Sequence, residues 1–148
     1  MVTVTLEATM RILHLMTAGI WAGWTVFMAV LVVPGARDGR LDPEALRWLT
    51  GQFSLLSKGA PLVTFVTGTY MVGQGYTTDA LLYSSRGTLV LTMIGLWLVL
   101  SGVTNLSSRR LTGCVDEIGV ERAARDARAP FAAAGVVALA LLLVGGWL

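Results

Sequence analysis

The sequence predicts an all-α integral membrane protein, a bundle of four transmembrane helices that forms one domain over residues 1–148. Hydrophobic residues make up 55% of the chain and charged residues only 14%, and the mean hydropathy is +0.71. This balance is typical of membrane proteins and unusual for a small soluble domain. Four long apolar stretches alternate with polar segments, and the basic residues gather in two of those segments. We therefore expect a multi-pass protein of the cell membrane.

The first apolar stretch, residues 10–33, is predicted as the first span. Its length exceeds the roughly 7–15 residues of a signal-peptide core, and no small-residue cleavage site follows, so we expect it to stay in the mature protein. Pro34 and Gly35 are expected to end this helix, because proline lacks a backbone donor and glycine permits a turn.

A helix start follows at Asp42, Pro43 and Glu44. Asp42 is a favourable N-cap, proline suits the first helical position, and an acid near the N-terminus complements the helix dipole. From Leu46 onwards, apolar residues recur at helical spacing. We predict an amphipathic helix at the cytoplasmic interface, with a cytoplasmic extension of the second span as the alternative.

The remaining spans are predicted over residues 60–78, 87–106 and 131–148. A spanning helix needs about 20 residues, and the second stretch reaches that length only by running on to Thr78. Opposite charges four residues apart, as in Glu121 and Arg125, support a solvated helix in the last connecting segment.

Charge gives the predicted orientation. Nine of the 11 basic residues fall within residues 34–59 and 107–130, so the positive-inside rule makes these two loops cytoplasmic and both termini external. Only Arg11 and Arg86 lie on the other side. Topology accounts for the net charge of +2, and no nucleic acid partner is expected.

The single histidine, His14, lies in the first span, about one turn inside the outer boundary. An imidazole in hydrocarbon needs a proton partner, a metal or a water-lined cavity, which makes His14 a functional candidate. Helical spacing places His14, Ala18, Trp21, Thr25 and Met28 along one stripe.

Gly19 and Gly23 form a GxxxG step on a neighbouring face, where the backbone of another helix can approach closely. The stripe of His14 is therefore expected to face the bundle interior. Trp21 and Trp24 lie near the predicted midplane, so their indole N–H groups need internal partners.

Met71 and Met93, on the second and third predicted spans, fall within about one turn of His14 in depth. One imidazole with one or two thioethers is a soft ligand set, suited to Cu(I) or to the axial positions of haem iron. Trp21 and Thr17 are expected to line this metal or haem site.

No catalytic residue is predicted. The sequence has no Walker lysine, GxSxG or HExxH motif, and every Asp and Glu lies in a loop or near a terminus. A carrier that uses a carboxylate buried in the membrane is therefore not expected. The lone Cys114 allows neither an intrachain disulfide nor a CxxC metal motif.

Several short motifs extend this pattern along the chain. They are Leu13-His14, Ile20-Trp21-Ala22-Gly23, Phe53-Ser54, Thr67-Gly68-Thr69-Tyr70, Gly87, and Asn105 with Arg109-Arg110-Leu111. Together they resemble the copper-resistance D (CopD) domain family and, more distantly, the four-helix haem-binding protoporphyrinogen oxidase family of bacteria.

The resemblance implies copper handling across the membrane in the first case, and haem b ligated by His14 in the second. Both families usually have a lysine early in the third helix, whereas residues 87–93 contain none and Met93 falls near that place. A thioether there favours metal or haem binding over porphyrinogen oxidation.

Three functions follow as hypotheses. The first is a CopD-like protein that binds or transports copper, and the second is a b-type haem protein or electron-transfer subunit. The third is a structural accessory subunit, in which His14 bonds a neighbouring helix and the Gly19/Gly23 face docks a partner. The expected partners are the lipid bilayer and a second copy of the chain or another membrane subunit.

Overall fold

The computed structural model describes the backbone of residues 2–147 and the side chains of residues 5–113 and 118–147. Its elements are all helical: α1 (Val2–Phe27), the π-helical turn η1 (Met28–Val32), α2 (Val33–Arg37), α3 (Pro43–Gly75), α4 (Thr78–Tyr83), α5 (Ser85–Ile118) and α6 (Val120–Gly146). The all-α prediction is confirmed. Leu148, where the fourth predicted span ends, and the side chain of Cys114 lie outside the described residues.

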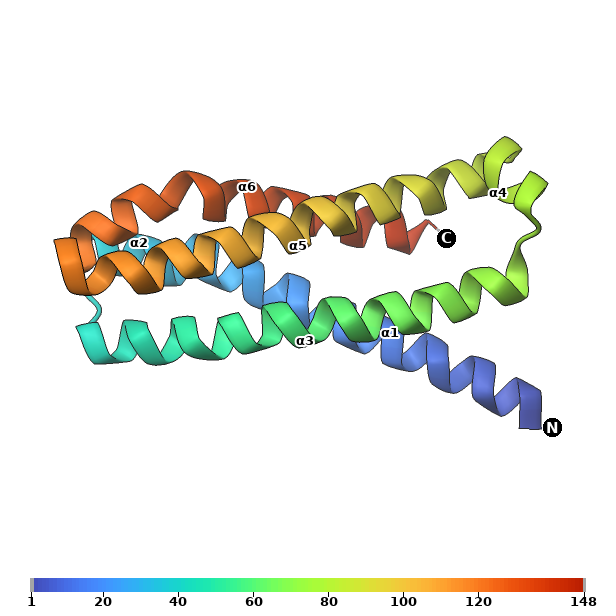
Figure 1. Cartoon of the computed structure of the whole chain (residues 1–148), viewed down its shortest axis with the longest axis horizontal. Coiled ribbons are helices and arrows are strands. Elements are labelled where there is room, and N and C mark those ends of the chain that lie inside the picture. The colour runs from blue at the N-terminus through green and yellow to red at the C-terminus, as the bar shows by residue number, and fades with distance from the viewer. Residues whose placement is uncertain (1, 148) are drawn as a thin grey trace.

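Four long helical segments form the bundle, and each runs antiparallel to the segment before it in the chain (Figure 1). The first, α1 with η1 and α2, packs against α3 and α6, and α5 packs against the same two helices on the other side. The chain termini and α4 lie at one end of this bundle, whereas the α2–α3 loop and the α5–α6 junction lie at the other (Figure 1). We call these the terminal end and the loop end.

The first helix continues past the expected stop at Pro34. In η1, the Val33 N–H donates to the carbonyl of Met28, five residues back, and such a π-turn often accommodates local strain in a helix. The helix then runs to Arg37, and Gly39, with a φ of 71°, follows its end. A left-handed glycine is a common helix terminator, so the end predicted at residue 33 was four residues early.

The predicted start at Asp42 is confirmed, since its side chain accepts from the Glu44 N–H at 3.2 Å. The separate interfacial helix is wrong, because α3 continues unbroken to Gly75. Leu46 and Phe53, on its apolar face, are fully buried in the bundle core. That face packs against other helices, so the alternative of an extended second helix is the correct one.

The segment of residues 107–130, predicted to connect the third and fourth spans, is also mostly helical. α5 runs on to Ile118, Gly119 makes the turn with a φ of 83°, and α6 begins at Val120. Leu111 packs with Ala123 and other small residues of α6, because short side chains let the two helices approach closely. The predicted surface pair of Glu121 and Arg125 forms at 3.7 Å.

Three of the described helical stretches are long and apolar enough to cross a membrane: Thr5–Arg37, Ser85–Gly113 and Val120–Gly146. The more polar α3 is not among them, yet it also exposes large apolar side chains on the outer surface, including Leu55, Leu62 and Val66. Helices of this kind are compatible with a multi-pass membrane protein.

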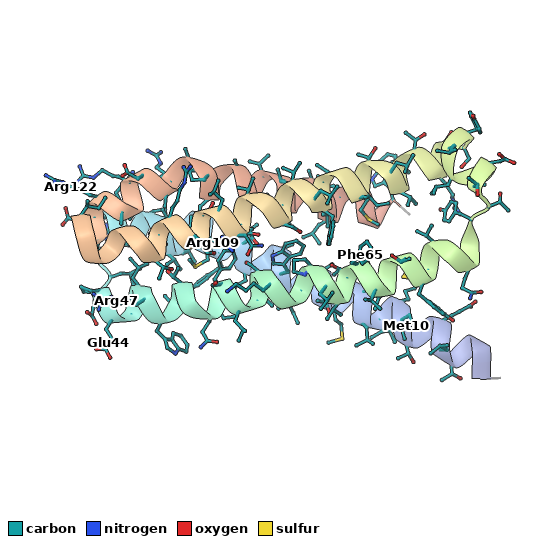
Figure 2. All side chains as sticks on the ribbon, viewed as in Figure 1. Met10, Glu44, Arg47, Phe65, Arg109 and Arg122 are labelled. Atoms are coloured by element: carbon teal, nitrogen blue, oxygen red, sulfur yellow. The ribbon has the colours of Figure 1, made fainter. Side chains whose placement is uncertain are left out.

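The core is closed at the loop end and hollow at the terminal end. Phe53 and Phe131 pack with ring centroids 5.6 Å apart near the loop end, where the labelled Arg47 and Arg122 also lie (Figure 2). Towards the terminal end, the first part of α1 diverges from the bundle (Figure 1). The candidate site lies between this part of α1 and the other helices.

Candidate functional site

The predicted stripe on α1 faces the bundle interior. Ala18, Trp21, Thr25 and Met28 are buried, and His14 is half-buried at the outer edge of the stripe. His14 Nδ1 lies 2.9 Å from Thr67 Oγ1 on α3. The imidazole is therefore held between two helices and does not lie free in lipid.

The hydroxyl of Thr67 determines which ring nitrogen of His14 carries the proton. Thr67 Oγ1 lies 2.7 Å from the carbonyl oxygen of Val63 and donates to it. A hydroxyl has one hydrogen to donate, so a Thr67 hydroxyl that donates to Val63 accepts from His14 Nδ1–H, and we assign this tautomer on that basis. In the neutral ring this leaves a lone pair on Nε2, the arrangement that a second-sphere partner gives a metal-ligating histidine.

Gly68 makes room for this ring. A Cβ atom at Gly68 would lie 3.1 Å from His14 Cε1 and 3.5 Å from Nδ1. Contacts near 3.1 Å are tighter than carbon atoms prefer, so a larger residue at this position would require the imidazole ring to shift.

A second hydroxyl on α3 holds α5. Trp97 Nε1 donates to Thr64 Oγ1 at 3.0 Å, and Thr64 donates in turn to the carbonyl of Ala60 at 2.8 Å. The Trp97 ring also stacks on Phe65, with centroids 5.7 Å apart. One turn of α3 thus positions side chains from both α1 and α5.

Two hollows meet at His14. An outer vestibule of about 1090 Å³ opens at the terminal end, and an inner cavity of about 270 Å³ lies deeper in the bundle. The inner cavity is lined by His14, Ala18, Trp21, Thr64, Phe65, Gly68, Thr69, Val72, Val90, Met93, Ile94, Trp97 and Leu141. We call the boundary between the two hollows the neck. The residues that line both are His14, Gly68, Val72, Val90 and Met93.

The two hollows differ in polarity. Arg11, Arg86 and Glu7 line the vestibule, so it carries charges of both signs with cations in excess. Among the described residues, no Asp, Glu, Lys or Arg side chain lines the inner cavity, and His14 lies at its border with the vestibule. A ligand seated across the neck would meet a polar surface on one side and, on the other, an apolar surface that includes Trp21, Phe65 and Trp97.

Of the five residues predicted to bind or line the site, four line one or both hollows and one does not. His14 and Met93 line both hollows, Met71 lines the vestibule, and Trp21 lines the inner cavity. Thr17 is half-buried but lines neither hollow.

Gly19 and Gly23 are exposed, and in the described part of the chain no neighbouring atom lies within 4 Å of a Cβ built on either. The close helix contact expected there is not made within the chain.

The indole N–H groups of the two tryptophans on α1 lack, in the described part of the chain, the internal partners that the sequence predicted for them. Trp21 Nε1 and Trp24 Nε1 are both buried, and neither has a hydrogen-bond partner among the described residues. Trp97, which the sequence did not single out, does have one.

The sequence also missed Thr64 as a positioning residue. Thr67 and Gly68 appeared there only as part of a family motif. The sequence feature that could have indicated these positions is a pair of threonines three residues apart, Thr64 and Thr67, followed by Gly68 in a mainly apolar stretch. Which ring nitrogen or indole they bond depends on helix packing and could not be deduced from spacing.

No group of three or more His, Cys, Asp or Glu side chains that could hold a metal occurs among the described residues. Comparisons with protein-family models, curated proteins and solved structures find no match to this chain.

Proposed function

We propose that this protein is a multi-pass membrane protein that binds copper as Cu(I) at the neck between the vestibule and the inner cavity. One observation carries the proposal. Of the five residues that line both hollows, only His14 and Met93 have a side-chain atom able to coordinate a soft metal.

The chemistry of these atoms matches Cu(I), which prefers imidazole and thioether ligands. Nε2 of His14 keeps its lone pair because Nδ1 is bonded to Thr67. Met71, which lines the vestibule, is a further sulfur ligand on the outer side. Copper would reach the neck from the vestibule as a bound substrate.

The proposed topology has four spans, with both termini outside and the loop end in the cytoplasm. At about 1.5 Å per residue, the 33 residues of α3 are more than long enough to cross a bilayer core. α3 packs between α1 and α5, both of which contain spanning stretches. A span flanked in this way can tolerate polar residues that face the bundle.

Copper binding is tested by titrating the purified protein with Cu(I) in competition with a chromogenic chelator. His14→Ala and Met93→Leu are each expected to weaken binding about tenfold or more, since each removes one ligand. Met16→Leu is the matched control, because Met16 lies on the same helix as His14 but is 60% exposed. Copper binding that is unchanged by His14→Ala would overturn the proposal.

Haem b is the second candidate, favoured by the vestibule and the inner cavity together, because the inner cavity of about 270 Å³ is by itself small for a macrocycle. Trp21, Phe65 and Trp97 contribute aromatic side chains, and Arg11 and Arg86 in the vestibule are suitable partners for propionates. His14 Nε2 and Met93 would hold its iron. Protein expressed with a haem supply should then show a Soret band that His14→Ala removes. Colourless protein that binds copper would exclude haem.

A further inference from the structure

Two arginines of the vestibule have no carboxylate partner. Arg11 of α1 and Arg86, near the start of α5, both line the vestibule together with Glu7. None of these three side chains forms an ion pair among the described residues. Both arginines are exposed, so an anion in the vestibule can contact them. A guanidinium group binds carboxylate and phosphate oxygens through paired, charged hydrogen bonds.

The inner cavity, next to this charged hollow, is suited to an alkyl chain. Phe65, Ile94 and Trp97 line it, and its described lining contains no Asp, Glu, Lys or Arg. Phe65 and Ile94 are also 56% and 43% exposed on the outer surface, and Figure 2 shows Phe65 on α3 where that helix faces α5. An alkyl chain that moves from a bilayer into this cavity stays in apolar surroundings, so the transfer costs little.

The two hollows follow one another in the order of the head group and chain of a lipid in its own leaflet. The spanning stretch of α5 begins at Ser85, which places Arg86 at a membrane boundary. Trp97 lies about three helical turns, or about 16 Å, further along α5. A head group at Arg86 can therefore direct its chain towards Trp97 and the midplane of the bilayer.

We propose that the vestibule and the inner cavity together bind a single-chain anionic lipid. Its carboxylate or phosphate head group is bound by Arg11 and Arg86, and its alkyl chain passes the neck into the inner cavity. The volume of that cavity is about 270 Å³, which is small for a ligand pocket, so it accommodates one chain and not the two of a phospholipid. This inference does not depend on copper binding.

Other ligands use only part of this arrangement. A small hydrophilic anion would contact the arginines but leave the apolar cavity unfilled. A neutral lipid would fill the cavity but gain nothing from the arginines, and a cationic amphiphile would be repelled by the excess of cations in the vestibule. An anionic head group on an alkyl chain uses both hollows and needs no metal ligand.

The experiment uses ω-bromododecanoate, whose bromine quenches tryptophan fluorescence on contact. The protein is placed in nanodiscs of zwitterionic lipid at about pH 9, where carboxylates are ionised. Trp48→Phe with Trp147→Phe forms the background, because these two indoles are 63% and 80% exposed and would report the surrounding lipid. We expect saturable quenching of the remaining tryptophans.

The head group is tested with ω-bromododecanol, which has the same chain without the charge, at the same mole fraction in the lipid. It should quench only weakly and without saturation. ω-Bromododecyl phosphate is titrated in parallel. Saturable binding of either anion supports the proposal, and the tighter of the two identifies the head group. Equal quenching by the alcohol, or no saturation with either anion, would overturn it.

The arginines are tested by substitution. Arg11→Gln and Arg86→Gln should each weaken binding of the anion about threefold, and together about tenfold, as expected for exposed ion pairs. Arg110→Gln is the matched control, because Arg110 is an exposed arginine of α5 that lines neither hollow. An equal loss of binding in the control would mean that the anion responds only to the overall charge, and the proposal would fail.

A cavity-filling variant tests the chain and separates this inference from copper binding. Ala18 lines the inner cavity but not the vestibule, so Ala18→Leu should reduce quenching by the anion to the level of the alcohol and leave Cu(I) binding unchanged. Ala18→Val replaces it if thermal unfolding shows that the leucine variant does not fold. Saturable quenching that survives both overturns this inference alone, whereas absent copper binding beside specific anion binding overturns only the proposed function.

Discussion

At the scale of single residues, the chemistry of the site depends on one proton. With the Thr67 hydroxyl donating to the carbonyl of Val63, we assign it as the acceptor for His14 Nδ1–H. This assignment leaves the lone pair of the neutral ring on Nε2. In the proposed copper site, a threonine that touches no metal would then decide which nitrogen atom of His14 is free to bind it.

The tautomer of His14 can be observed directly, because the chain contains a single histidine. In protein with 15N-labelled histidine, NMR should show one ring with a protonated Nδ1 and an unprotonated Nε2. Thr67→Val should remove this preference and weaken Cu(I) binding about 10- to 100-fold, as loss of a partner of a metal ligand does.

Thr50→Val is the control, since the Thr50 hydroxyl bonds only to Leu46 of its own helix and lines neither hollow. A protonated Nε2 in the unsubstituted protein would contradict the assignment.

The second prediction at this scale concerns Gly68. Gly68→Ala places a methyl group 3.1 Å from His14 Cε1, which should displace the ring, break the bond to Thr67 and weaken ligand binding. Gly73→Ala is the control on the same helix, where a Cβ atom would meet no neighbour within 4 Å among the described residues. It makes the same change in helix propensity without a contact to His14, so binding should be unchanged. Cu(I) titration and the histidine NMR spectrum measure both variants. If Gly68→Ala and Gly73→Ala bind Cu(I) equally well, the contact at Gly68 does not affect binding.

At the scale of elements, a side chain from α5 completes the backbone hydrogen bonding of α3. Pro61 lies inside α3 and has no N–H for the carbonyl of Ser57 four residues earlier. Asn105 Nδ2 of α5 donates to that carbonyl at 3.3 Å and to Ser101 at 2.9 Å. The amide thus supplies the donor that the proline removed, one turn below the Thr64 layer of the site.

This compensation predicts a double-mutant result. Asn105→Leu should lower the free energy of unfolding by about 1 kcal/mol, since it leaves the Ser57 carbonyl unbonded in an apolar bundle. Pro61→Ala should recover most of that loss in the Asn105→Leu background, because alanine restores the N–H within the helix. Unfolding in mixed detergent micelles measures the cycle. No recovery would mean that Asn105 stabilises the bundle in another way.

At the scale of the whole molecule, nine of the 11 basic residues lie in the two segments towards the loop end, and the vestibule opens at the terminal end. Arg47 and Arg122, from different segments of the chain, both lie at the loop end (Figure 2). The vestibule instead opens beside α4 and the start of α1, where Arg11 and Arg86 lie. In the proposed topology, which rests on the positive-inside rule, the vestibule would open away from the cytoplasm.

Cysteine labelling tests this orientation. In a Cys114→Ser background, Tyr83→Cys, at an 85% exposed position of α4, should react with a membrane-impermeant maleimide added to intact cells. Arg122→Cys, at the loop end, should react only after the membrane is permeabilised. The reverse pattern would place the vestibule in the cytoplasm.

Local sequence signals determined the helical class and several boundaries of this protein. Hydropathy placed long helices in the right regions, and Asp42 with Pro43 fixed the start of α3. The stripe from His14 to Met28 faced inwards as predicted, because helical periodicity depends only on neighbouring residues. The segments 34–59 and 107–130 were wrongly predicted as connectors outside the bundle. Their apolar faces are buried by helices that are distant in the sequence.

The tertiary structure alone decided what surrounds His14. Its bond to Thr67 spans 53 residues of sequence, and the neck between the hollows draws on α1, α3 and α5. Such contacts depend on how each helix is rotated and shifted against its neighbours, which no single segment encodes. The sequence could therefore name the imidazole, while only packing could decide which of its nitrogen atoms is left for a ligand.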